Sequence, residues 1–231
     1  MVNINKFKWS FKKELEILDE IKEELELVTY DEDDNTIESN FSRLFYRNIS
    51  EDVTTYNTGA TKLVLIKEED PNYVLKIPLH GYNPTSPFKR ADDINAGTSW
   101  DYCENEAIKY KDIKDDAIKE FFAETIWVED LSDDMIIYAQ EKAEPFSRDN
   151  SAFTDEDHEK ASRIISSHTW TRLSSTWVIL AIRYYGFEKV EKLFTFFDEN
   201  PEYSGDLHGG NVGIAVKDKR PVIFDYSGYR D

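Results

Sequence analysis

The sequence predicts an α+β protein folded in two lobes. Residues 51–143 alternate between strand-like and helical patterns, residues 154–199 have helical periodicity, and residues 211–226 return to two short strands. With 231 residues, of which 40% are hydrophobic, the chain can bury a substantial core. We therefore expect an antiparallel-sheet N-lobe followed by a reduced, mainly helical C-lobe.

The N-terminal residues 1–50 are predicted to form a helical extension. Residues 10–28 have apolar side chains three and four positions apart, and Ser10 can cap the helix. One face of this helix carries Leu15, Leu18, Ile21 and Leu25. Because an amphipathic helix needs an apolar partner, we expect this face to pack against the rest of the protein.

The N-lobe, residues 51–143, is predicted to contain two pairs of strands with one helix between them. A segment rich in proline and glycine, residues 80–99, is expected to be a loop. The strands are expected at residues 61–67, 73–79, 121–130 and 134–143, and the helix at residues 100–113.

The C-lobe, residues 144–231, is predicted to hold three helices and a closing strand hairpin. Gly186 and Asn200 are typical signals for the ends of the last two helices. The helices are expected at residues 154–173, 174–186 and 187–200, and the strands at residues 211–216 and 221–226.

The charge, the cysteine content and the lengths of the apolar runs indicate which partners and which cellular compartment suit this protein. A formal net charge of −19, from 28 basic and 47 acidic residues, disfavours contact with nucleic acid or an anionic membrane and suits a basic protein partner. Cys103 is the only cysteine, so no intramolecular disulfide can form. The longest apolar run, residues 177–182, is too short to cross a bilayer, and the N-terminus lacks the apolar stretch of a signal peptide. We expect a soluble, cytoplasmic protein.

The closing hairpin, GDLHGGNVGIAVKDKRPVIFDYSG at residues 205–228, carries the strongest chemical signal. Two glycines allow the loop between Asp206 and Asn211 to fold back on itself. Pairing of the two strands would then bring Asp225 near Asn211. Two carboxylates and an amide oxygen are hard ligands suited to Mg²⁺, although a polar loop before a solvated hairpin is the simpler interpretation of each residue alone.

Two further features lie in the predicted N-lobe. Lys76 lies among the apolar residues of YVLKIPL, where a lysine needs either an exit to solvent or an acidic partner. Glu106, on the following helix, is the expected partner. Gly59 precedes a strand in YNTGATKLVLI, and a backbone loop at this position is suited to covering phosphates.

Taken in order, these motifs resemble those of the protein-kinase-like superfamily. VLKIP resembles the third-strand lysine motif, NEAIKYKDI the helix with the partner glutamate, and QEKAEPF the hinge between the lobes. GDLHGGN resembles the catalytic loop, and its sequence is closer to that of aminoglycoside and choline phosphotransferases than to that of eukaryotic protein kinases. FDYSG resembles the metal-binding triplet. The resemblance covers residues 53–228 and implies a two-lobed kinase-like fold.

The resemblance also implies an ATP-dependent phosphotransferase that uses Mg²⁺. Lys76, held by Glu106, would contact the inner phosphates, and Asn211 and Asp225 would bind the magnesium ion. Asp206 would orient or deprotonate the hydroxyl of an acceptor, which is a protein or a small molecule.

Four further positions receive roles in the same way. Gly59 would cover the phosphates, and the hinge backbone from Glu141 to Ala143 would hydrogen-bond the adenine. His208 would touch the transferred phosphate or serve a structural role.

The sequence departs from the family pattern in several places. Only Gly59 remains clear in the glycine-rich loop, Ser204 and Gly205 replace the histidine that usually precedes Asp206, and Gly228 comes one place late in the triplet. No activation segment follows the triplet in this sequence, so we expect a minimal C-lobe. These departures leave open a pseudokinase-type binding module that acts through a protein partner. The net charge leaves open an acidic decoy for a basic protein, and transfer of AMP is a further alternative.

Overall fold

The computed structural model describes residues 11–17, 19, 56–58, 62–67, 70–78, 99–132, 135–144, 153–168, 173–204 and 207–226. The chain is an α+β protein with antiparallel sheets and several helices, as the sequence predicts. It divides into two compact units, Met1–Ala107 with Thr125–Gln140 and Ile108–Glu124 with Glu141–Asp231. Each unit is described by itself below.

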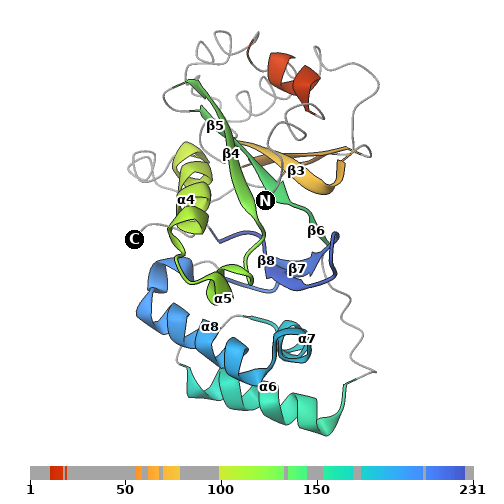
Figure 1. The fold of residues 1–231 in the computed structure, drawn as a ribbon, viewed down its shortest axis with the longest axis vertical. Coiled ribbons are helices and arrows are strands. Elements are labelled where there is room, and N and C mark those ends of the chain that lie inside the picture. The colour runs from red at the N-terminus through yellow and green to blue at the C-terminus, as the bar shows by residue number, and fades with distance from the viewer. Residues whose placement is uncertain are drawn as a thin grey trace, which may run out of the picture. The chain divides into compact units, whose positions relative to one another are not determined.

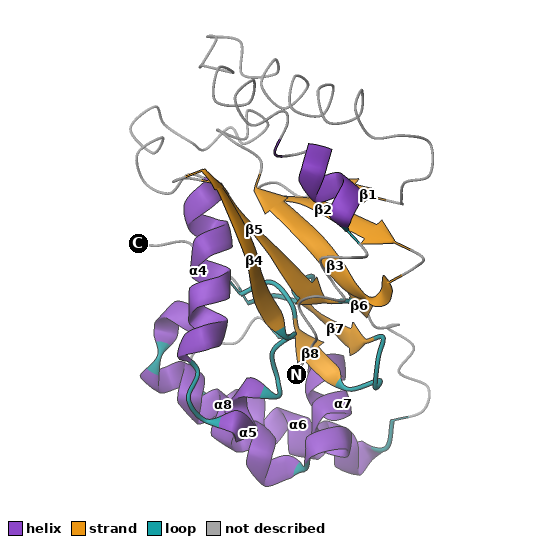
Figure 2. Ribbon diagram, turned by 45° about the horizontal axis from the view of Figure 1, so that its top comes forward, coloured by secondary structure: helices purple, strands orange, loops and turns teal. Residues whose placement is uncertain are grey.

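The first unit contains a five-stranded sheet, seen as the orange arrows β1 to β5 in Figure 2. The strand order is β1-β2-β3-β5-β4, and the pairs β1–β2, β2–β3 and β4–β5 are antiparallel. Its buried apolar residues include Leu65, Leu75, Ile77 and Ile137. The strands are β1 (Tyr56–Thr58), β2 (Lys62–Lys67), β3 (Asp70–Pro78), β4 (Thr125–Ser132) and β5 (Met135–Glu141).

The N-terminal segment belongs to this unit. Residues 12–17 are helical, and Phe11, Leu15 and Ile17 are buried. Glu14 is also fully buried, and its Oε2 lies 2.7 Å from Nζ of Lys67 on β2. Leu15 is therefore buried as expected, whereas the side chains predicted to share its face at positions 18, 21 and 25 lie outside the described residues.

Helix α4 (Ser99–Asp112) agrees with the helix predicted at residues 100–113, and the division between the units falls after its residue Ala107. It is followed by α5 (Asp116–Lys119), which the sequence did not predict, since one short turn has no periodicity to detect. The side chain of Asp115 caps α5 by accepting the N–H of Ala117 at 2.9 Å.

Three longer helices form the core of the second unit (Figure 1). They are α6 (Asp155–Ser167), α7 (Ser175–Tyr185) and α8 (Phe187–Glu199), followed by the short 3₁₀ helix η2 (Pro201–Tyr203). Thr154 begins α6 in a capping box with Asp157. Gly186, with φ of 89°, ends α7, because only glycine adopts this backbone conformation at little cost. The fully buried side chains of this core include Phe121, Phe122, Trp177, Phe194, Phe197 and Tyr226.

A second, three-stranded sheet completes this unit. It consists of β6 (Ala143–Glu144), β7 (Val212–Ala215) and β8 (Pro221–Ile223), in the order β6-β7-β8. A Cβ atom at Gly213 would lie only 2.4 Å from the carbonyl oxygen of Glu144, so β6 and β7 approach closely only because residue 213 is glycine.

One predicted strand begins later in the structure than the sequence indicated. Residues 121–130 were expected to form a strand, but β4 begins at Thr125. The preceding aromatic residues Phe121 and Phe122 are instead buried in the core of the second unit, where the Phe122 and Tyr226 ring centroids lie 5.0 Å apart.

Among the helices in the described part of the chain, none has the length and hydropathy needed to cross a membrane.

Candidate functional site

The ion pair expected between Lys76 and Glu106 is present in the first unit. Nζ of Lys76 lies 3.1 Å from Oε1 of Glu106, and the two side chains are 7% and 0% exposed. Lys76 lies on β3 and is itself buried, so its ammonium group is held inside the protein. A buried charge of this kind is stable only with an ionic partner.

Glu106 also accepts hydrogen bonds from two residues that the sequence analysis missed. The hydroxyl of Tyr138 donates to Oε2 at 2.8 Å, and the amide of Gln140 donates to Oε1. The same amide donates to Oγ1 of Thr125 at 3.0 Å. Tyr138 and Gln140 are two positions apart on β5 and so share a face, and that alternation of polar residues was the available signal.

This arrangement fixes the position of the Lys76 ammonium group. Three donors hold the Glu106 carboxylate, and the Tyr138 ring centroid lies 5.7 Å from Nζ of Lys76. The result is a cation whose place is set by buried polar groups rather than by solvent. Such a group is suited to binding a phosphate or a carboxylate.

Residues of the GDLHGGN loop lie in the second unit. The N–H of Asn211 donates to the carbonyl of His208 at 3.0 Å, and the N–H of Gly210 donates to Nδ1 of the His208 ring, also at 3.0 Å. His208 is exposed, and because Nδ1 is an acceptor, a neutral ring carries its proton on Nε2. Asp206 lies outside the described residues, as does Gly59 of the first unit.

The closing hairpin brings Asn211 opposite the chain segment that contains Asp225. Val212 pairs with Ile223, and the N–H of Phe224 donates to the carbonyl of Asn211 at 2.9 Å. Asp225 is the next residue, so the two proposed oxygen ligands are diagonal neighbours along the backbone. Within the described part of the chain, no group of three or more His, Cys, Asp or Glu side chains is arranged to hold a metal ion.

Lys109 fixes the backbone beside Asp225. Its ammonium group donates to the carbonyl of Tyr226 at 3.3 Å and to the carbonyl of Glu202 at 2.5 Å. In return, the hydroxyl of Tyr203 donates to the carbonyl of Lys109 at 3.1 Å. Helix α4, η2 and the segment after β8 are therefore joined in the second unit.

The residues predicted to form a hinge lie where β5 leads into β6. The side chain of Glu141 is 2% exposed and forms a double ion pair with Arg220, so it is engaged inside the protein. Ala143 pairs with Ala215 of β7, while the N–H of Val216 donates to the carbonyl of Lys142 at 2.9 Å. Because bonded and non-bonded pairs alternate along an antiparallel ladder, the N–H and C=O of Ala143 point away from β7.

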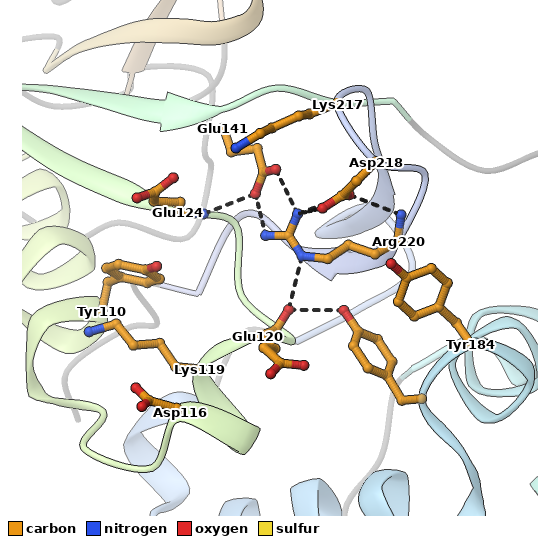
Figure 3. A pocket seen from close by; sticks show the side chains of 11 residues that line it. Tyr110, Asp116, Lys119, Glu120, Glu124, Glu141, Tyr184, Lys217, Asp218 and Arg220 are labelled. Carbon is orange, nitrogen blue, oxygen red and sulfur yellow. Dashed lines mark hydrogen bonds and ion pairs between the residues drawn. The ribbon is translucent and has the colours of Figure 1, made fainter. Parts of the chain in front are cut away.

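Behind this segment the second unit has a polar pocket of about 430 Å³ (Figure 3). Burial alone would lower the pKa of Arg220, but the carboxylates of Glu141 and Asp218 outweigh it and hold that pKa above its ordinary value. Burial, with the charge of Glu124, raises the pKa of the Tyr110 phenol. The lining residues are Tyr110, Asp116, Lys119, Glu120, Glu124, Glu141, Tyr184, Tyr185, Lys217, Asp218 and Arg220.

The sequence matches no protein-family model, and no curated protein is significantly similar to it.

Proposed function

We propose that the protein is a kinase-like, ATP-dependent phosphotransferase that uses Mg²⁺ and transfers the γ-phosphate to a hydroxyl group of a protein or small molecule. The observation that supports this most is the buried Lys76–Glu106 pair, 3.1 Å between Nζ and Oε1. Phosphoryl transfer depends mainly on positioning and on neutralising phosphate charge, and a lysine held by a carboxylate provides both. A two-lobed kinase-like arrangement of the chain is part of the proposal.

Each remaining residue has a role in this proposal. Lys76 contacts the inner phosphates, and Asn211 and Asp225 supply oxygen ligands of the type that Mg²⁺ prefers. Asp206 orients or deprotonates the acceptor hydroxyl. The outward N–H and C=O of Ala143 bind the adenine, whose N1 and N6 offer a matching acceptor and donor.

Thermal unfolding with ATP, with and without Mg²⁺, tests nucleotide binding. At 100 times the dissociation constant, a ligand stabilises the folded state by about 2.7 kcal/mol. Lys76→Met should abolish most of this stabilisation. Lys67→Met is the matched control, because it also removes a strand lysine from a buried glutamate, Glu14, at 2.7 Å. If neither wild type nor control is stabilised by millimolar Mg-ATP, the proposed function is wrong.

Turnover of ATP, with mass analysis of the products, tests the chemistry. Asp206→Asn should leave ATP binding nearly intact and lower the transfer rate by about 10²-fold or more, since general-base help contributes about 10²–10⁴-fold. Equal turnover in wild type and Asp206→Asn would favour the pseudokinase-type binding module. Appearance of AMP on the acceptor would identify nucleotide transfer instead.

A further inference from the structure

Arg220 is the centre of a hydrogen-bonded network in the second unit (Figure 3). Its Nη1 donates to Oε1 of Glu141 at 2.6 Å, its Nη2 donates to Oε2 of Glu141, and its Nε donates to the carbonyl of Glu120 at 3.2 Å. Both oxygens of Asp218 lie 3.1 Å from Nη1. The Arg220 side chain is only 14% exposed, so water competes little for these bonds. A fork-shaped pair of this kind fixes direction as well as distance.

The network holds Glu141 from several sides. Oε2 of Glu141 accepts the N–H of Glu124 at 3.2 Å, and the N–H of Glu141 donates to the carbonyl of Glu124 at 2.8 Å. The hydroxyl of Tyr185 lies 2.9 Å from the carbonyl of Glu120 and 3.0 Å from that of Pro221, so the segments that flank Arg220 are tied together as well. Position 141 is therefore fixed by side-chain and backbone bonds together.

The point that Arg220 fixes is the beginning of an edge strand. β6 starts two residues after Glu141, and in the described sheet it has β7 on one side only. The N–H of Ala215 donates to the carbonyl of Arg220 at 2.8 Å, on the β8 side. This agrees with the assignment of Ala143 and Ala215 as a non-bonded pair, with the polar groups of Ala143 directed outward.

We infer that Arg220 is a positioning residue, which holds the N–H and C=O of Ala143 at the place where they bind a purine base. This inference rests on the proposed function. It explains how the base-binding edge of β6 is already in position before the nucleotide binds. Only Lys142 separates Glu141 from Ala143, so a loss of the fork displaces the edge directly. The phosphate and metal contacts, which other residues provide, do not depend on it.

Binding of two fragments of ATP separates these contributions. Adenosine reports on the base edge alone, and Mg-tripolyphosphate reports on the phosphate and metal contacts. For Arg220→Met we expect adenosine affinity to fall about tenfold, because a fall of this size corresponds to about one molecule in ten having the edge in its binding position. Tripolyphosphate affinity should be unchanged. Amide exchange at Val216, whose N–H bonds to Lys142 at 2.9 Å, should become faster.

The matched control is Arg183→Met. Arg183 forms a similar fork with Asp157, at 3.2 Å and 2.7 Å, in the same unit but on helices α6 and α7. It should leave adenosine affinity unchanged. Arg220→Lys keeps the charge but loses the fork, so it should behave like Arg220→Met.

The outcomes separate this inference from the proposed function. Equal losses of adenosine and tripolyphosphate affinity in Arg220→Met, or full affinity in that variant or in Arg220→Lys, overturn the positioning role while leaving an ATP site intact. A wild-type protein that binds neither ATP nor adenosine overturns both.

Discussion

Replacing Lys76 with methionine should leave Glu106 buried without its cation. The two side chains are 7% and 0% exposed, and removing one member of a buried pair costs about 3–5 kcal/mol. Glu106 keeps the hydrogen bonds from Tyr138 and Gln140, and bonds to a charged group contribute about 1.5–3 kcal/mol each. These bonds continue to stabilise the carboxylate, so we expect the lower part of the range, about 3–4 kcal/mol.

Urea unfolding followed by both circular dichroism and tryptophan fluorescence measures this loss, since two compact units need not unfold together. A second variant, Lys76→Met with Glu106→Leu, tests the cause. It should recover only part of the stability, because the hydroxyl of Tyr138 and the amide of Gln140 lose their acceptor.

A loss below about 0.5 kcal/mol for Lys76→Met would refute the reasoning, because exposed ion pairs give changes of that size. Full recovery in the double variant would mean that Tyr138 and Gln140 find other acceptors, and that the network around Glu106 is not closed.

The remaining predictions concern the second unit. Gly213→Ala should destabilise the protein by about 1–3 kcal/mol, because its Cβ would lie 2.4 Å from the carbonyl oxygen of Glu144. The control Gly209→Ala should destabilise it much less, since the nearest atom to that Cβ would be 3.9 Å away. Equal urea midpoints for the two variants would contradict this prediction. Thr154→Ala removes the N-cap hydroxyl of α6 and should lower unfolding free energy by about 1 kcal/mol, with an unchanged value arguing against the capping box. Burial raises the pKa of Tyr203 from 10.0 to about 12, so the unfolded state loses that proton first, and stability should fall as pH rises between these values. Tyr203→Phe should reduce this alkaline loss, and identical pH profiles for the two proteins would show that the phenol is not buried.

The parts of the site that the sequence predicted are those with a local signature. Lys76 lies among apolar residues, and a lysine in that context needs a carboxylate, which the next helix provides at Glu106. The hairpin register that brings the segment of Asp225 to Asn211 followed from two short strands and the turn between them.

The parts that the sequence could not predict depend on contacts between distant polar residues. Arg220 and Glu141 are 79 positions apart, and no local sequence pattern around either residue predicts that the other is its partner. The polar face of β5 was visible as alternation, but alternation alone does not say which element covers that face. Phe121 and Phe122 read as strand residues because aromatic side chains favour strands, and their burial in the helical core of the second unit overrides that preference.

The fork between Arg220 and Glu141 has a consequence for how this sequence can diverge. Loss of the arginine alone leaves Glu141, which is 2% exposed, as a buried charge without a cation beside a second carboxylate at Asp218. Loss of the glutamate alone leaves a guanidinium that has lost its double contact. Substitutions at positions 141 and 220 should therefore be inherited as a pair, and in an alignment of diverged relatives these two columns should covary more strongly than either does with its neighbours in sequence.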